Sequence, residues 1–367
     1  MSDTTSTPHK KNSSHRGVHR AGGGTADQTP PQSQAEMMEY CQDEIAHNTW
    51  QFEASSISHM LSPKSLKNNV PPEDIRCFED AQKHCKFLVD APFFEPALET
   101  AVKSLSPSEW PSSDAERDYY TPLANFLNDC IQKCNNALNA QKSDRGVPEF
   151  ARRLYGKLKF AVYDRPMLDG IDGAAAVKPN LGSSRNLQEG VKLSWGAVEA
   201  KGVRQMDVPG EVKLLWSQLL AQAAVYARYL FSASPTRTWS LVLGFNQKEK
   251  NLRFLIFHRG GCTASTDLNL TTEQGRKEAC RLILTMLLWT EDYHAGFCCF
   301  STDKEYAIPG PERDPTLFLK ARVEKNLHHT LAVCTRGTLV SILSKSAIDP
   351  TPLHHLHHLH LYLPIGR

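Results

Sequence analysis

Two short patterns in the middle of the chain contain residue types that could do chemistry. Glu199 and Lys201 stand two residues apart in a stretch that is predicted to be a strand, so their side chains lie on one face. The preceding positions on that face are apolar: Val191, Leu193, Trp195 and Ala197. A carboxylate and an ammonium at the end of a buried face each need a partner, which favours a functional site.

The second pattern lies on the helix that is expected to follow this strand. Gln222 and Tyr226 are four residues apart, so they lie one above the other on a single helix face. A carboxylate beside a lysine suits metal-assisted hydrolysis of a phosphodiester, because the carboxylate holds Mg²⁺ and the lysine orients the attacking water. The candidate catalytic residues are therefore Glu199, Lys201, Gln222 and Tyr226.

The elements that must position these residues form a strand-rich region that follows a helical one. Three segments have apolar residues at helical spacing: residues 35–48, 71–90 and 114–140. Three strands are predicted next: residues 157–164, 174–182 and 192–202. A nearly apolar helix is expected from about 212 to 231. A hairpin (238–245 with 251–260) and a helix (271–293, capped by Thr271 or Thr272) complete the region.

The order of these patterns resembles the RecB-like branch of the PD-(D/E)XK nuclease superfamily. In that superfamily a proline–aspartate pair precedes the E-x-K strand, and a Q-x-x-x-Y helix follows it. Here Pro179 and Asn180 stand at the first position, so an amide replaces the aspartate. The resemblance implies a Mg²⁺ site held by Glu199 and Asn180, although Mg²⁺ usually takes one or two carboxylates plus substrate phosphate. Asp169 or Asp172 could replace the missing carboxylate only if their loop folds back.

A longer stretch, about residues 116–340, resembles the region that precedes the kinase domain in the fungal-type protein kinase family. The shared features are a Q-x-x-x-Y-x-R helix, an arginine before a hairpin and an aromatic-D-R-x-G turn. They correspond in this sequence to Gln222, Tyr226, Arg228, Arg237 and the turn from Phe257 to Gly260. His258 stands where the family usually has aspartate.

The kinase resemblance ends soon after its phosphate loop. Arg336, Gly337 and Thr338 resemble the short loop with which that family's kinase domain opens, and they are the candidate cofactor-binding residues. Neither HRD nor DFG occurs in the sequence, so we expect a truncated kinase region without phosphoryl transfer, and ATP binding only in full-length relatives. The five histidines from His354 to His360 could bind metal, but a shifted reading frame or an arbitrary extension explains this tail better.

Composition limits the partners and the location. The 367 residues carry a formal net charge of +2, so the overall charge does not support a nucleic-acid partner, and an unknown protein partner is the other possibility. The chain has ten cysteines without a CxxC pair, no apolar N-terminal segment and no apolar run of about 18 residues. We therefore expect an intracellular protein, in cytoplasm or nucleus, with free thiols and no membrane segment. Cys130 and Cys134 are expected to be small buried hydrophobes.

Together these features predict an α+β chain with a PD-(D/E)XK-nuclease-like core. Its expected parts are a disordered tail (1–36), a helical region (37–145), the nuclease-like α/β core (146–305), a linker (306–325) and the start of a kinase-like domain with a His-rich tail (326–367). Three functions stay open. The first is a non-catalytic regulatory or interaction module of the fungal-type protein kinase family, which would need no cofactor. The second is a Mg²⁺-dependent nuclease with a degenerate first carboxylate. The third is a scaffold that binds a protein.

Overall fold

The computed structural model describes the chain between residues 33 and 345, with several gaps. The described residues are 33–66, 85–106, 109–141, 146–167, 175–196, 201–234, 237–297, 305–309, 318–329 and 339–345. They form helices and a mixed sheet, which confirms the predicted α+β class.

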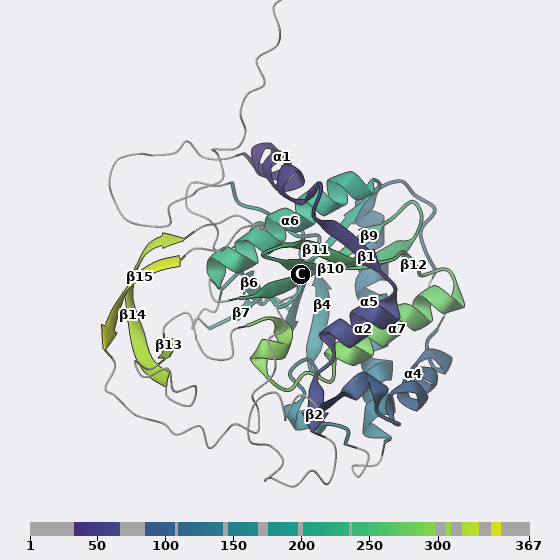
Figure 1. Ribbon diagram of the computed structural model, residues 1–367. Coiled ribbons are helices and arrows are strands. Elements are labelled where there is room, and N and C mark those ends of the chain that lie inside the picture. Colours follow the sequence, from purple (N-terminus) through teal and green to yellow (C-terminus); the bar gives the residue numbers. More distant parts are fainter. Residues whose placement is uncertain are drawn as a thin grey trace, which may run out of the picture.

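A mixed sheet lies at the centre of the structure (Figure 1). Its strands are β1 (Thr49–Phe52), β4 (Leu158–Val162), β5 (Leu181–Arg185), β8 (Gly210–Lys213), β9 (Trp239–Asn246), β10 (Asn251–His258), β11 (Gly261–Ser265) and β12 (Leu268–Asn269). Within the described ranges their order is β1-β11-β10-β9-β8-β5-β4, and β12 pairs with β10. β1 is parallel to β11 and β8 to β9, whereas the other neighbours are antiparallel.

The two long central strands are buried on both faces. Alternate residues of β9 enter different apolar clusters: Leu241 and Leu243 belong to the larger cluster, and Val242 belongs to the smaller one. The same alternation holds on β10, where Phe254 enters the larger cluster and Leu255 the smaller one. Because successive side chains of a strand point to opposite faces, the sheet needs a helical layer on each side.

Helices supply both layers (Figure 1). The smaller cluster is covered by α1 (Gln34–Ile45) and α6 (Trp216–Ala233). The larger cluster is covered by α2 (Ala54–Leu61), α4 (Phe94–Lys103), α5 (Tyr120–Asn139) and α7 (Glu273–Met286). Helices from the predicted helical region thus share one core with α7 and the sheet, so these parts pack as a single body.

Several shorter elements complete the described structure. Two small pairs are β2 (Lys64–Leu66) with β3 (Cys85–Phe87), and β6 (Lys192–Ser194) with β7 (Val203–Gln205). A separate antiparallel sheet contains β13 (Glu305–Pro309), β14 (Phe318–His329) and β15 (Leu339–Lys345). The 3-10 helices are η3 (Leu88–Asp90), η4 (Glu116–Tyr119), η6 (Phe150–Arg152) and η7 (Asp292–Ala295).

Several predicted elements are confirmed. The hairpin is formed by β9 and β10, which pair antiparallel along their full length. Thr272 is the N-cap of α7, because its hydroxyl accepts a hydrogen bond from the Gly275 amide at 3.0 Å. The apolar stripe predicted on α5 is buried as expected: Tyr120, Leu123, Phe126, Leu127, Cys130 and Ile131.

All three predicted strands differ in their bounds, the first only slightly, because β4 covers Leu158–Val162 and not 157–164. The strand expected at 174–182 begins only at Leu181, because Pro179 has no N–H to donate to a ladder. The strand expected at 192–202 ends at Ser194. Lys201 lies in an exposed turn before Gly202, whose φ of +78° is a left-handed conformation that favours glycine.

Other predicted bounds were also wrong. Residues 85–90, expected to end a helix, form β3 and η3. α1 begins at Gln34, within the expected tail, because Ser33 and Glu36 form a capping box. The expected linker contains β13 and the start of β14, where apolar and charged residues alternate from Leu319 onward as in a strand. Of the described helices, none is long and apolar enough to cross a membrane.

Candidate functional site

A second E-x-K tripeptide lies on β8, inside the sheet between β5 and β9. Residues 210–213, which include the expected start of a helix, are a strand, and α6 begins only at Trp216. Glu211 and Lys213 therefore share one face of β8, while Val212 enters the larger apolar cluster on the other face. Glu211 is only 3% exposed, so its carboxylate depends on protein groups for hydrogen bonds.

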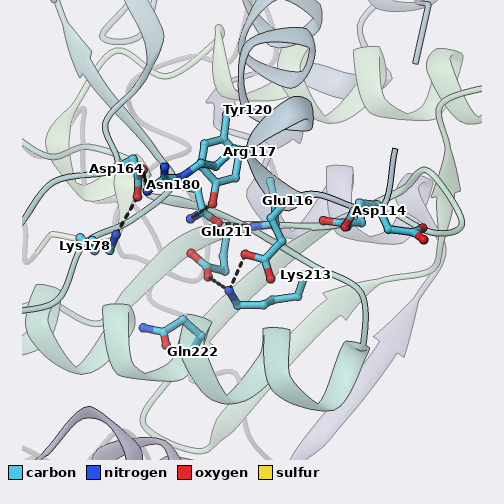
Figure 2. A network of polar contacts seen from close by, with 12 residues as sticks. Asp114, Glu116, Arg117, Tyr120, Asp164, Lys178, Asn180, Glu211, Lys213 and Gln222 are labelled. Carbon is cyan, nitrogen blue, oxygen red and sulfur yellow. Dashed lines mark hydrogen bonds and ion pairs between the residues drawn. The ribbon is translucent and has the colours of Figure 1, made fainter. Parts of the chain in front are cut away.

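The Glu211 carboxylate is held from two sides. The Tyr226 hydroxyl of α6 donates to its Oε2 at 2.6 Å, and the Lys213 ammonium lies 3.1 Å from its Oε1. The same ammonium lies 2.8 Å from Oε2 of Glu116 in η4. Figure 2 shows Lys213 between these two carboxylates. One lysine thus bridges a carboxylate of the sheet and a carboxylate of the preceding helical segment.

Burial and pairing act against each other on these groups. Burial raises the pKa of Glu211 to about 7, although Lys213 and the Tyr226 hydroxyl oppose the shift. Burial also acts to lower the pKa of Lys213, but Glu211 and Glu116 outweigh it and raise that pKa overall. Near neutral pH, Lys213 is therefore charged while Glu211 is divided between its two protonation states.

Asn180 uses both ends of its amide for contacts within the fold. Its Oδ1 accepts a hydrogen bond from the Val212 backbone N–H at 2.8 Å, and its Nδ2 donates to the Tyr120 hydroxyl at 2.7 Å. The residue is 5% exposed. It therefore ties the end of β8 to the start of α5, and a carboxylate at this position could not donate to Tyr120.

Replacing Asn180 with leucine tests this role. The variant leaves the Val212 N–H and the Tyr120 hydroxyl without their partner, so we expect the free energy of unfolding to fall by about 2 kcal/mol. The control Tyr120→Phe removes only one of the two bonds and should cost about 1 kcal/mol. Urea denaturation followed by circular dichroism measures both losses. Equal losses in the two variants would contradict a tie made at both ends of the amide.

These residues line a cavity of about 400 Å³. Its walls come from segments far apart in the sequence: Gln34, Ala115, Glu116, Arg117, Tyr120, Asp164, Lys178, Asn180, Glu211, Lys213, Gln222 and Tyr226. The volume falls within the range of small-molecule sites in proteins. Figure 2 shows the polar side chains converging from the sheet, from η4 and from α6.

The charges around the cavity balance. Three carboxylates face three cations, and they form two groups. Asp164 lies 3.0 Å from the Lys178 ammonium and 3.3 Å from the Arg117 guanidinium. The other group contains Glu116, Glu211 and Lys213. Because each carboxylate has a cation within ion-pair distance, the arrangement has no excess charge for a highly charged ligand.

Gln222 lines the cavity from α6 and is 2% exposed. Its Oε1 accepts a hydrogen bond of 2.8 Å from Nε2 of Gln34, the first residue of α1. The first turn of α1 is therefore part of the cavity wall, although this residue was expected to lie in a disordered tail.

The structure brings together some of the predicted site residues and not others. Gln222, Tyr226 and Asn180 line one cavity. Lys201 is exposed and does not line that cavity. Glu199 lies outside the described residues, and so do the predicted phosphate-loop residues Arg336, Gly337 and Thr338 and the histidine-rich tail.

The site residues that sequence reasoning missed include Glu211, Lys213, Glu116 and Asp164. A signal for the first two was present, because Glu211, Val212 and Lys213 are themselves an E-x-K tripeptide that precedes Gln222. The apolar run that begins at Val212 leads directly into α6, so it predicts a helix there and hides the tripeptide. No local pattern indicated Glu116 or Asp164, which reach the cavity only through the tertiary fold.

The side chains present do not fit a divalent cation as they are arranged. The carboxylates of Glu116 and Glu211 are the natural ligands, but the Lys213 ammonium lies within 3.1 Å of both. The amide of Asn180 is committed to other partners. In the described part of the chain, no three His, Cys, Asp or Glu side chains are grouped so that they could hold a metal ion.

We compared the chain with family models, with curated proteins and with solved structures, and none of them matches it. The function is therefore inferred from the geometry of the cavity and from the resemblances in the sequence.

Proposed function

We propose that this chain is a non-catalytic module of the fungal-type protein kinase type, built on a PD-(D/E)XK-nuclease-like core. In this proposal the E-x-K pair is Glu211 and Lys213, the proline–aspartate position is Asn180, and the Q-x-x-x-Y pair is Gln222 and Tyr226. The cavity keeps the framework of a nuclease site and uses its polar groups to hold the fold. The module acts through binding to another protein.

The observation that carries the proposal is that the Asn180 amide makes two hydrogen bonds within the fold. A nuclease of this type needs a carboxylate here to hold Mg²⁺ together with the glutamate of E-x-K. Asn180 instead accepts from Val212 and donates to Tyr120, at 2.8 and 2.7 Å. An amide that joins two secondary-structure elements in this way has a structural role, and it brings no negative charge to the cavity.

The position of Lys213 supports the same conclusion. In metal-assisted hydrolysis the lysine must be near the attacking water. Here its ammonium bridges Glu116 and Glu211 and takes the place between two carboxylates that a divalent cation would need. The remaining carboxylate, Asp164, is engaged by Lys178 and Arg117. All charged groups of the cavity are thus neutralised within the chain.

One observation favours a Mg²⁺-dependent nuclease as the second candidate. Glu116 and Asp164 place two further carboxylates in the cavity, so the charge lost at Asn180 is available from other elements. This function requires Lys213 and Lys178 to move away from the carboxylates that they pair with. We rank it below the non-catalytic module because Lys213 is paired with Glu116 and Glu211, and Lys178 is paired with Asp164.

A hydrolysis assay separates the two functions. The full chain and its Asn180→Asp variant are incubated with Mg²⁺ or Mn²⁺ and end-labelled single- and double-stranded DNA and RNA. We expect the wild type to leave every substrate intact at enzyme concentrations equal to those of the substrate. The control Glu211→Gln, alone and combined with Asn180→Asp, identifies cleavage that comes from this cavity. Cleavage by the wild type that Glu211→Gln abolishes would overturn the proposal in favour of the nuclease.

A further inference from the structure

Three cysteine thiols meet inside the helical layer, on the opposite side of the sheet from α6. Cys130 and Cys134 lie one turn apart on α5, and Cys280 faces them from α7; all three are fully buried. The Sγ atoms of Cys130 and Cys280 are 3.5 Å apart. The Cys134 thiol instead donates to the backbone carbonyl of Cys280, with its Sγ 3.8 Å from that oxygen.

We propose that Cys130 and Cys280 are an oxidation site, at which a peroxide converts the two thiols into a reversible disulfide between α5 and α7. This inference is independent of the proposed function of the cavity. It commits to this pair because their sulfurs lie 3.5 Å apart, whereas the Cys134 thiol donates to the Cys280 carbonyl.

The geometry allows this bond after a small movement. A disulfide has an S–S distance of about 2.0 Å, so the two sulfurs must approach by about 1.5 Å. A void of about 10 Å³ lies nearby, between the two helices and the sheet. It is lined by Leu127 and Ile131 of α5, by Ile283 and Leu287 of α7 and by residues of β4, β9 and β10, but by none of the three cysteines. This space is about the size of one water molecule, and a hydrogen peroxide molecule is only slightly larger.

The reaction balances with one peroxide for each disulfide. Hydrogen bonding from the Cys130 thiol lowers the pKa of Cys280 below its ordinary value, although burial opposes this shift. The Cys280 thiolate attacks a peroxide oxygen, forms a sulfenic acid and releases hydroxide, which takes up a proton to give water. The Cys130 sulfur then attacks the Cys280 sulfur, and the second oxygen leaves as water. Two thiols lose two electrons and two protons, and one hydrogen peroxide becomes two water molecules.

The bond would join helices that are far apart in the sequence. α5 begins at Tyr120, whose hydroxyl accepts the hydrogen bond from Asn180, and α7 packs beside α5 on the larger cluster. A covalent link between them closes a long loop of chain, and such links act mainly on the unfolded state. Oxidation is therefore expected to raise the thermal unfolding midpoint by about 5 °C.

Peptide mapping of the full chain tests the proposal. The protein is reduced, desalted, treated with hydrogen peroxide, blocked with N-ethylmaleimide in denaturant and digested with trypsin without reduction. Trypsin cuts after Lys133, so Cys130 and Cys134 fall on different peptides and each pairing has its own mass. We expect a Cys130–Cys280 peptide pair in most molecules and its loss after dithiothreitol. Cys85, which is only partly buried, reports that the oxidant has acted.

Serine variants provide matched controls. Cys134→Ser should keep the cross-link, whereas Cys130→Ser and Cys280→Ser should lose it, each with the circular dichroism spectrum of the wild type. The wild-type map alone can overturn the proposal, so it does not depend on the folding of a variant. Alkylated Cys130 and Cys280 beside an oxidised Cys85 would overturn it, and so would a cross-link only between Cys134 and Cys280.

Discussion

The Lys213→Met variant is expected to lose about 3 kcal/mol of unfolding free energy at pH 8, because it leaves the Glu211 carboxylate buried without its cation. The Lys213 ammonium lies 3.1 Å from Glu211, whose side chain is 3% exposed, so water cannot replace the lost partner. At pH 5 the loss should shrink to below about 1 kcal/mol, because Glu211 is then protonated in both proteins. Urea denaturation at the two pH values measures the difference.

The matched control is Lys213→Arg, which keeps a cation between Glu211 and Glu116. We expect it to cost less than about 1 kcal/mol at either pH, since the ion pairs can be remade with the guanidinium. A loss in Lys213→Met that is the same at pH 5 and pH 8 would show that the methylene chain, and not the charge, carries the effect.

The second large effect concerns the pH dependence of stability. Glu211 has a pKa of about 7 in the folded protein and 4.5 as its ordinary value, so the folded state binds the proton more tightly than the unfolded state. The contribution of Glu211 to stability is therefore greatest below pH 4.5 and is lost as the pH rises to about 7. The full loss from this group is about 3 kcal/mol. Glu211→Gln cannot titrate, so the difference in unfolding free energy between variant and wild type should grow over that interval.

The difference between the two proteins is the informative quantity, because burial also raises the pKa of Asp207 and affects both equally. Glu116→Gln provides the control, since Glu116 lies on the other side of Lys213 and its side chain is 33% exposed. That variant should follow the wild-type profile. Parallel profiles for Glu211→Gln and the wild type would show that the Glu211 carboxylate is not buried as described.

Local patterns were enough to predict much of the fold. The β9–β10 hairpin, the Thr272 cap and the buried stripe of α5 each depend on residues that are close in the sequence, and each was found as expected. The apolar face at Leu193 and Trp195 is also buried, at 0% and 1% exposure. Lys201 does not continue that strand face, because it lies in a turn.

The choice between two E-x-K tripeptides could not be made locally. The residues after Gly210 continue without a break into the apolar start of α6. Their spacing therefore predicts a helix, although they form a four-residue strand. Only the pairing of β8 with β9 shows that Glu211 faces Tyr226. Glu116 and Asp164 come from outside the E-x-K region altogether, and their approach to Lys213 and Lys178 is a property of the assembled sheet.

The structural role of Asn180 could not be predicted from the sequence, although the residue stands where the nuclease-type pattern has aspartate. The sequence contains the substitution itself, whereas the two partners of the amide are a backbone N–H 32 residues away and a hydroxyl 60 residues away. Buried amide groups in folded proteins are nearly always hydrogen-bonded. The partners of Asn180 can be identified only when the positions of β8 and α5 are known.

Binding of Mn²⁺ by isothermal titration calorimetry at pH 7.5, on the full chain and on Glu211→Gln, tests whether Lys213 takes the place of a metal ion between Glu116 and Glu211. We expect the two titrations to be the same at millimolar Mn²⁺. Lys213→Met, which frees the two carboxylates, should gain a measurable affinity. Binding by the wild type that is lost in Glu211→Gln would contradict this expectation.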